Sequence, residues 1–232
     1  MLHQISTVLL GPLLLAQGRH VRRTVLKLPE AAGPRDGVSG EGPDLRLLVV
    51  GDSAGAGVGA ATQADALVGR ITEHLAASAT VRWRVIARTG ATTASTLRHL
   101  NKIEPERFDL AVTSLGVNDV TAGRSVGAWI DEQAALVDLL RDRFGVGQVL
   151  LSALPPVHLF PSLPQPLRWY LGNQAKRFNR ALAAWASQRG DCTFVTLNYP
   201  MDVTLMAEDR FHPGPGIYAL WAEAVAEAIG VG

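Results

Sequence analysis

Apolar residues are concentrated in five short runs along the chain, and each run is followed by a stretch with helical spacing. Short apolar runs bounded by glycine, proline or polar residues are typical of strands that are buried on both faces. The predicted strands are residues 45–50, 81–87, 108–115, 147–154 and 192–197. The predicted helices are residues 60–79, 92–100, 125–144, 167–188 and 215–229.

Strand and helix alternate through most of the chain, and this alternation determines the expected fold. Parallel strands need a crossover long enough to hold a helix, and each gap between the predicted strands leaves that room. We therefore expect an α/β fold, a three-layer α/β/α sandwich around a five-stranded parallel sheet. We place this domain at residues 44–232, a length that suits one α/β domain with a large core.

Residues 1–43 precede the predicted domain and differ from it in composition. Residues 5–15 are apolar, but this run is shorter than the roughly 20 residues that a membrane-spanning helix needs. We expect residues 1–27 either to contact a membrane surface peripherally or to pack back on the domain as an amphipathic arm. Residues 29–43 are rich in glycine, proline and charge and predict a linker without structure of its own. The basic residues of the arm are Arg19, His20, Arg22, Arg23 and Lys27.

The composition narrows the possible partners and the compartment. Hydrophobic residues make up 47% of the chain and charged residues 19%, which is typical of a globular domain rather than a disordered chain. The formal net charge of +1 gives no reason to expect a nucleic-acid partner, which usually requires a concentrated basic face. Cys192 is the only cysteine, which excludes an internal disulfide and a thiolate-rich metal site. We expect a cytoplasmic protein, free or membrane-associated through the arm, with a periplasmic location as the alternative; no oligomeric state is indicated.

Polar residues and glycines follow three of the predicted strands and precede the last helix. Open α/β sheets bind ligands at the edge where the carboxyl ends of their strands lie. Acyl transfer by a serine needs a nucleophile, a base, a carboxylate that orients the base and donors for the oxyanion. This edge carries a candidate for each role. The strand ends read Gly51-Asp52-Ser53, Thr89-Gly90-Ala91 and Gly116-Val117-Asn118-Asp119, and the segment before the last helix reads Glu208-Asp209-Arg210-Phe211-His212-Pro213.

Three of these residues are candidates for proton transfer. Ser53, in a glycine-rich turn, is the candidate nucleophile, and His212, in a loop just before Pro213, is the candidate base. Asp209 lies three residues before His212, a spacing at which its carboxylate can accept from the imidazole and fix its tautomer. Alternatively, Asp209 only caps backbone donors before the helix.

The candidate oxyanion donors are Gly90 and Asn118. A glycine at a strand end lets its backbone N–H approach a ligand closely, and a carboxamide offers two N–H donors. The structural alternatives are a plain turn at Gly90 and an Asx turn formed by Asn118 with Asp119.

Taken together, the four segments resemble the SGNH, or GDSL, hydrolase family. The resemblance covers the predicted domain from its first strand to its last helix, and the order of the segments agrees. It implies a flavodoxin-like three-layer fold and an enzyme without a metal or organic cofactor. It also implies that Ser53 is the nucleophile, His212 the general base and acid, and Asp209 the orienting carboxylate. The Ser53 N–H, the Gly90 N–H and the Asn118 side chain would form the oxyanion hole.

Other interpretations of the glycine-rich turn stay open at this point. Residues 51–55 also fit the Gly-x-Ser-x-Gly elbow of α/β-hydrolases, although that elbow normally follows several strands and an oxyanion segment of the His-Gly-Gly-Gly type. Residues 55–60 fit a loose dinucleotide fingerprint, but Arg88 stands where an acidic residue would end the second strand. A nucleotide-binding protein, or an inactive fold retained for binding, would not explain why every catalytic residue type is present.

The substrate is less well defined than the reaction. The glycine and alanine run after Ser53 departs from the polar or aromatic residues that the family often has there, which leaves substrate choice open. An apolar, proline-rich loop at residues 157–166 lies next to a strand end and predicts either an acyl pocket or a surface loop packed on the core. We expect a serine esterase for short- to medium-chain acyl or aryl esters, from small molecules or lipids. Thioesterase, lysophospholipase or carbohydrate acetylesterase activity would use the same residues. The candidate substrate-binding residues are Asp52, Val157, Leu159 and Phe160.

Overall fold

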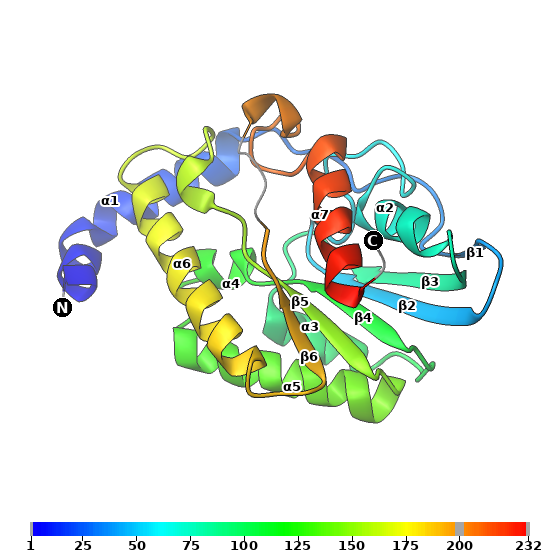
Figure 1. Ribbon diagram of the computed structural model, residues 1–232. Coiled ribbons are helices and arrows are strands. Elements are labelled where there is room, and N and C mark those ends of the chain that lie inside the picture. The colour runs from blue at the N-terminus through cyan, green and yellow to red at the C-terminus, as the bar shows by residue number, and fades with distance from the viewer. Residues whose placement is uncertain (1, 198–201, 231–232) are drawn as a thin grey trace.

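A twisted sheet forms the middle layer of the molecule, with the strand order β1-β3-β2-β4-β5-β6 (Figure 1). The computed structural model describes residues 2–197 and 202–230, and their side chains from residue 10 onward. Within the described residues, the five predicted strands are all present and parallel to one another. The parallel strands are β2 (Asp44–Gly51), β3 (Thr80–Ala87), β4 (Leu110–Ser114), β5 (Gln148–Ser152) and β6 (Cys192–Val195).

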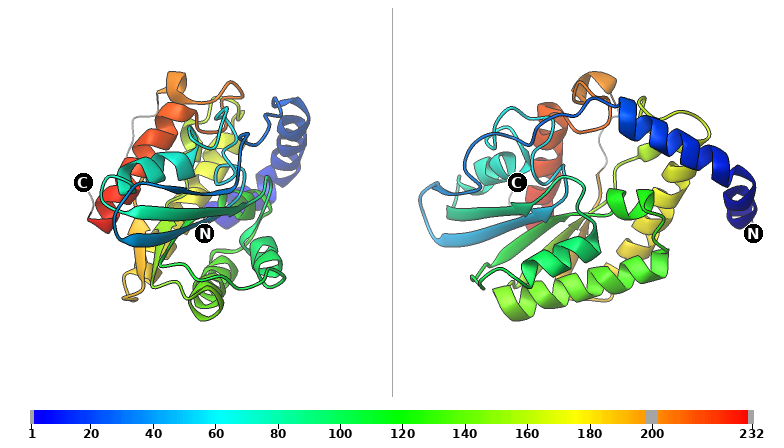
Figure 2. Two further views of the ribbon diagram at one scale, coloured as in Figure 1. Left: turned by 90° about the vertical axis from the view of Figure 1, so that its right-hand side faces the viewer. Right: turned by 180° about the vertical axis from the view of Figure 1, so that it is seen from behind.

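Helices cover both faces of the sheet, as the three-layer prediction requires (Figures 1 and 2). One face packs against a core that includes Trp129, Phe144 and Phe178, and the other against a core that includes Ile71 and Tyr218. The predicted α/β/α sandwich is therefore confirmed. The helices over the first face are α3 (Thr93–Leu100), α5 (Val126–Phe144) and α6 (Leu167–Ala186), and those over the second are α2 (Leu67–Leu75) and α7 (Pro215–Ile229).

A sixth strand, β1 (Asp36–Ser39), lies at the sheet edge and pairs antiparallel with β3. This strand falls inside residues 29–43, so the prediction that the whole segment lacks structure of its own is wrong. Gly37 allows the pairing, because a Cβ at this position would lie 2.7 Å from the Trp83 ring. The strand has only four residues, none of them fully buried, which is why no apolar pattern marks it in the sequence.

Helix α2 is shorter than the predicted helix over residues 60–79, because a long-range pairing holds its first part in another conformation. The Ala32 N–H donates to the Ala61 carbonyl at 3.0 Å, and the Gln63 N–H donates to the Ala32 carbonyl at 2.8 Å. These bonds use backbone groups that a helix would pair locally. The helix therefore begins only at Leu67.

Helix α1 (Leu2–Thr24) runs along one side of the domain and is joined to β1 by an extended segment (Figures 1 and 2). It begins well before, and ends well after, the apolar run at residues 5–15, and Pro12 lies inside it. Leu10, Leu14 and Val21 pack against the core, which agrees with the arm that packs back on the domain. Among the described helices, none is both long and apolar enough to cross a membrane.

Gly59 provides a test of the packing between the turn after β2 and the segment before α7. Its φ is +97°, and a Cβ there would lie 2.2 Å from the Pro213 carbonyl oxygen. We expect Gly59→Ala to lower the free energy of unfolding by about 2–4 kcal/mol, through backbone strain and overpacking. Gly127→Ala is the control, because Gly127 has no left-handed φ and no atom near a new Cβ. Urea unfolding that shows equal stability for both variants would contradict this account.

Candidate active site

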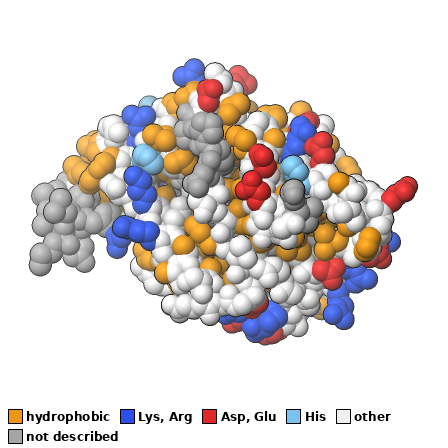
Figure 3. All heavy atoms as spheres, in the orientation of Figure 1, with side chains coloured by type: hydrophobic (Ala, Val, Ile, Leu, Met, Phe, Trp, Pro, Cys, Tyr) orange, Lys and Arg blue, Asp and Glu red, His pale blue; other side chains and the backbone are white. Residues whose placement is uncertain are grey.

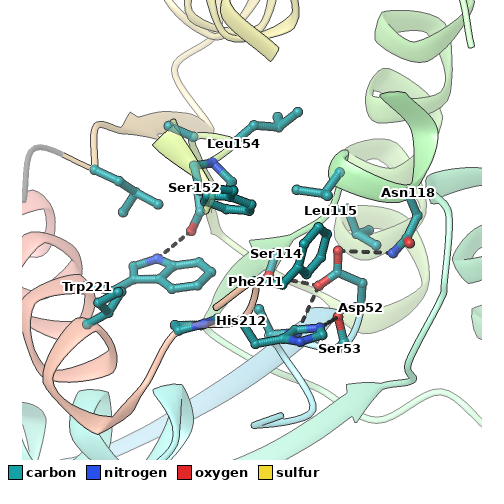
Figure 4. Close-up of a pocket in the computed structure, with 18 of the residues that line it drawn as sticks. Asp52, Ser53, Ser114, Leu115, Asn118, Ser152, Leu154, Phe211, His212 and Trp221 are labelled. Atoms are coloured by element: carbon teal, nitrogen blue, oxygen red, sulfur yellow. Dashed lines mark hydrogen bonds between the residues drawn. The ribbon is translucent and has the colours of Figure 1, made fainter. Parts of the chain in front are cut away.

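Ser53, His212 and Asp209 form a continuous chain of hydrogen bonds at the carboxyl edge of the sheet. Figure 4 shows Ser53 and His212, the first two members of this chain. Nε2 of His212 lies 2.9 Å from Oγ of Ser53, and Nδ1 lies 2.5 Å from Oδ2 of Asp209. The Asp209 contact fixes the tautomer with the proton on Nδ1, so that Nε2 is free to accept the proton of Ser53. The structure therefore brings together the three residues that the sequence singled out for proton transfer.

The position of Ser53 follows from the topology of the sheet. The chain passes from β2 to β3 on one side and then crosses to β4 on the other, so a crevice opens at the carboxyl end of β2. The Asp52 N–H donates to the Ser114 carbonyl at 3.0 Å, which fixes the end of β2 beside the end of β4. The Tyr218 hydroxyl of α7 lies within hydrogen-bonding distance of the Ala54 and Val58 carbonyls on the turn that carries Ser53.

Asp209 both accepts from the His212 imidazole and caps backbone N–H groups, the two alternatives that its spacing suggested. Each carboxylate oxygen has one of these roles. Oδ2 contacts the imidazole, while Oδ1 accepts from the backbone N–H groups of Phe211 and His212, each at 3.0 Å. Its side chain is fully buried. Burial alone would raise the pKa of Asp209, but the hydrogen bonds from the His212 ring and from the two N–H groups outweigh it and lower the pKa. The carboxylate is thus charged at neutral pH and can stabilise an imidazolium.

Asp52 is buried directly behind Ser53 and contacts the protein rather than open space. Oδ1 accepts from the Ala54 N–H at 3.0 Å and from the Ser114 hydroxyl at 3.4 Å. Oδ2 accepts from Nδ2 of Asn118 at 3.3 Å. Burial raises the pKa of Asp52 to about 6, and the hydrogen bond from Ala54 offsets part of that shift. Asp52 lines the cavity, as a substrate-binding residue should, but these bonds indicate that it positions the turn and Asn118.

Asn118 lies in the short helix α4 (Val117–Thr121), so it does not form the Asx turn considered as an alternative. Its Nδ2 also donates to the Ala91 carbonyl at 3.0 Å, which joins it to the turn after β3. The neighbouring Asp119 has a structural role, since its buried carboxylate accepts from the N–H and the hydroxyl of Thr93 at the start of α3.

Gly90, the other predicted oxyanion donor, lies in an exposed turn with a φ of +78°. It is outside the set of residues that line the cavity, although its neighbour Ala91 contacts Asn118. Within residues 2–197 and 202–230, neither the Gly90 N–H nor the Ser53 N–H donates a hydrogen bond to another residue. Both donors are therefore available to a ligand.

A largely apolar cavity of about 70 Å³ adjoins Ser53 and His212 (Figure 4). Of the predicted loop residues, only Phe160 lines it; Val157 is buried in the core, and Leu159 is 45% exposed at the surface. The helical turn η1 (Val157–Leu159) causes this, because it directs successive side chains to different sides. The apolar residues of the lining include Leu115, Leu154, Phe160, Phe211, Ile217 and Trp221.

Sequence reasoning missed most of this lining, and only part of it left a signal. Ser114 and Ser152 are the last residues of β4 and β5, so their place at the carboxyl edge could have been inferred from the strand ends. Trp221 reaches the cavity from α7, where its Nε1 donates to Oγ of Ser152 at 3.0 Å. On a helix that is apolar on most sides, the sequence does not show which side faces a cavity. Among the described residues, no group of His, Cys, Asp or Glu side chains is arranged to hold a metal ion.

Comparison with known proteins places this geometry in a family. The family model of GDSL-like lipases and acylhydrolases matches residues 49–220. GDSL-like esterase Rv1075c of Mycobacterium tuberculosis is 29% identical over 240 residues, which cover 94% of this chain and 76% of that protein.

Two solved structures show the same fold at low identity. The lipase Lip_vut3 from a goat rumen metagenome has a TM-score of 0.62 and 20% identity, over 81% of this chain and 98% of that one. The acetylxylan esterase Axe2 of Geobacillus stearothermophilus has a TM-score of 0.60 and 17% identity, over 82% of this chain and 95% of that one. Since the family model covers most of the predicted domain, the chain belongs to the GDSL-like lipase/acylhydrolase family and is an ester-hydrolysing enzyme.

Proposed function

We propose that the protein is a serine esterase that works through an acyl-enzyme intermediate. The hydrogen-bonded chain from Ser53 through His212 to Asp209 carries this proposal. Oγ of Ser53 attacks the ester carbonyl while Nε2 of His212 takes its proton, and the resulting imidazolium gives that proton to the departing alcohol. Water then attacks the acyl-enzyme with His212 as base, which releases the acid and restores the Ser53 hydroxyl.

The negative charge that develops on the carbonyl oxygen needs donors in fixed positions. The Ser53 and Gly90 N–H groups have no other acceptor within the described part of the chain, which supports their assignment to the oxyanion hole. Asn118 is the third donor. Its bond to Asp52 is long, at 3.3 Å, and an oxyanion is a strong acceptor that can replace it.

The cavity supports short- to medium-chain acyl or aryl groups as the acid part of the substrate. Its wall is mainly aliphatic and aromatic, and the Phe160 and Phe211 rings pack edge to face with centroids 5.3 Å apart. The polar side chains of the lining already bond to protein groups: Ser152 to Trp221, and Ser114 and Asn118 to Asp52. Few polar partners remain for sugar hydroxyls, whose burial without hydrogen bonds is unfavourable. The likeness to an acetylxylan esterase, at 17% identity, concerns the fold.

The catalytic assignment predicts the effect of single substitutions on the hydrolysis of p-nitrophenyl butyrate. We expect Ser53→Ala and His212→Ala each to lower kcat by at least about 10⁴-fold, because each removes an indispensable part of the relay. Ser187→Ala, at the exposed C-cap of α6, and His99→Ala, at an exposed position of α3, are matched controls and should keep wild-type rates. Circular dichroism verifies folding of each variant. Wild-type kcat in folded Ser53→Ala would refute the assignment.

The acyl preference is tested with a series of p-nitrophenyl esters of increasing chain length, matched thioesters and acetylated xylan. We expect kcat/KM to be highest for short to medium chains and to fall for long ones, because the cavity is small. Trp221→Phe keeps an aromatic ring, but a smaller one, and removes the bond to Ser152; it should shift this optimum while Ser53 stays reactive. Equal turnover of acetylated xylan and p-nitrophenyl butyrate would overturn the proposed substrate class.

A further inference from the structure

Helix α1 presents two different faces to its surroundings. Leu14 and Val21 contact the domain, and Gln17 anchors the helix to the loop before α6. The Gln17 side chain donates to the Gln165 carbonyl at 2.7 Å and accepts from the Leu167 N–H at 3.1 Å. The opposite face is exposed, and among the described side chains of α1 it carries Leu15 together with three arginines. The arginines are Arg19, Arg22 and Arg23.

The exposed hydrophobic residues are not spread evenly over the molecule. Of the seven large hydrophobic side chains that are exposed among the described residues, only Val38 lies away from the carboxyl edge of the parallel strands, on β1. The other six lie on α1, just after it, or on the segments that follow β5 and β6. These six are Leu13, Leu15, Leu26, Leu159, Trp169 and Val203.

Charge distinguishes this surface from an ordinary apolar patch. The sequence of α1 contains no aspartate or glutamate, while its C-terminal half contains three arginines and Lys27 follows shortly after. In the view of Figure 3, hydrophobic and basic side chains lie side by side at the end of the molecule where Figure 1 places α1 and the start of α6. An apolar surface interspersed with basic residues complements a lipid surface that carries negative headgroups.

We propose that this surface, formed by α1, η1 with the start of α6, and η2 (Val203–Leu205), docks on an anionic lipid surface. The exposed leucines and Trp169 would enter the boundary between headgroups and acyl chains, and the arginines would contact lipid phosphates. Because the loop that α1 contacts also carries Phe160 of the cavity wall, docking places the cavity near the lipid.

The experiment is sedimentation of the full chain with vesicles of phosphatidylcholine alone or with phosphatidylglycerol. We expect the wild type to bind only the anionic vesicles. The triple variant Arg19→Gln/Arg22→Gln/Arg23→Gln should bind these vesicles with an affinity lower by on the order of 100-fold, about fivefold for each charge removed. The control triple variant is Arg82→Gln/Arg98→Gln/Lys102→Gln, which removes the same charge from the opposite end of the sheet, from α3 and from the turn after α3. It should bind within about twofold of the wild type.

The apolar part of the surface has its own pair of variants. Leu13→Ser/Leu15→Ser should weaken binding by on the order of tenfold, whereas Val38→Ser should have no effect. All variants should hydrolyse soluble p-nitrophenyl butyrate at the wild-type rate, which verifies folding. Absence of wild-type binding, or equal losses in control and test variants, would overturn the proposal. So would a concentration-dependent dimer that Leu13→Ser/Leu15→Ser abolishes, because the surface would then bind a second copy of the chain.

A second, independent observation concerns Glu30, which lies outside the residues that the family model matches. Its Oε1 accepts from the N–H of Thr89 at 2.7 Å and from its hydroxyl at 2.8 Å. Its Oε2 pairs with Arg35 at 2.5 Å, and Arg35 donates to the Ala87 carbonyl at 2.6 Å. The segment before β1 therefore binds the end of β3 at Ala87 and the following turn at Thr89, the residues on either side of Arg88.

We infer that Glu30 is a positioning residue for the turn that presents the Gly90 N–H. This inference rests on the proposed oxyanion role of Gly90. A Cβ at Gly90 would find no atom within 4 Å, so Gly90 is held through its neighbours in the turn. Ala91 is held by Asn118, and Thr89 is held by Glu30. The acceptor atom, rather than the charge, is what the Thr89 donors require.

Glu30→Ala should lower kcat on the order of tenfold and leave KM within about twofold, since the bonds that it affects act on the transition state. Glu30→Gln keeps an acceptor for both Thr89 donors but loses the ion pair with Arg35, and should restore part of the loss. Glu41→Ala, which changes an exposed carboxylate in the turn between β1 and β2, is the control. A wild-type kcat in Glu30→Ala, or no restoration by Glu30→Gln, would overturn the inference.

Amide hydrogen exchange separates this inference from the proposed mechanism. Exchange at Thr89 should accelerate in Glu30→Ala and not in Glu41→Ala, whether or not Ser53 is the nucleophile. Unchanged exchange would show that Glu30 does not hold the turn, even if the substitution lowers kcat.

Discussion

The hydrogen bond between Nε2 of His212 and Oγ of Ser53 joins residues that are 159 positions apart, and much of the structure serves to keep it at 2.9 Å. Ser53 is fixed by the end of β2, and His212 by the segment just before α7. Tyr218 of α7 contacts the turn that carries Ser53, and Gly59 on that turn allows the Pro213 backbone to approach. The two halves of the site are therefore packed directly on each other, which reduces the entropy that catalytic alignment would otherwise cost.

Two buried aspartates flank this bond, and their surroundings give them opposite properties. Asp209 has a lowered pKa because its hydrogen bonds, among them the imidazole contact, outweigh its burial. For Asp52 burial dominates, and its pKa rises to about 6. A carboxylate of low pKa suits the stabilisation of an imidazolium, whereas Asp52 contacts the donors Ala54, Ser114 and Asn118 around the serine turn. Two aspartates near Ser53 thus have different roles because their surroundings differ.

The parts that sequence predicted well are those fixed by local pattern. Apolar runs identified the five parallel strands, and short motifs identified Ser53, Asp209 and His212, which the fold brings into contact. The parts that were missed depend on pairing between distant segments. The length of α2 depends on bonds from Ala32, and β1 depends on its fit over Trp83. In the loop after β5, composition predicted an apolar contribution to the cavity, but only the backbone decided that Phe160 would supply it.

The segment before β2 is the least predictable part of the chain, and it contacts the rest of the molecule at the cavity loop and at the turn that carries the proposed oxyanion donor Gly90. Gln17 contacts the loop that carries Phe160, and Glu30 contacts the turn beside Gly90. Lipid binding to α1 could change the rate of catalysis through these contacts only under one condition. The contacts would need two conformations, and the lipid surface would have to bind one of them more tightly than the other. The contacts are hydrogen bonds of 2.7–3.1 Å to backbone groups, and they join the segment directly to the cavity loop and to the turn after β3. Docking is therefore expected to act by concentrating a lipid ester near an already formed site, which lowers the apparent KM for that ester and leaves kcat unchanged.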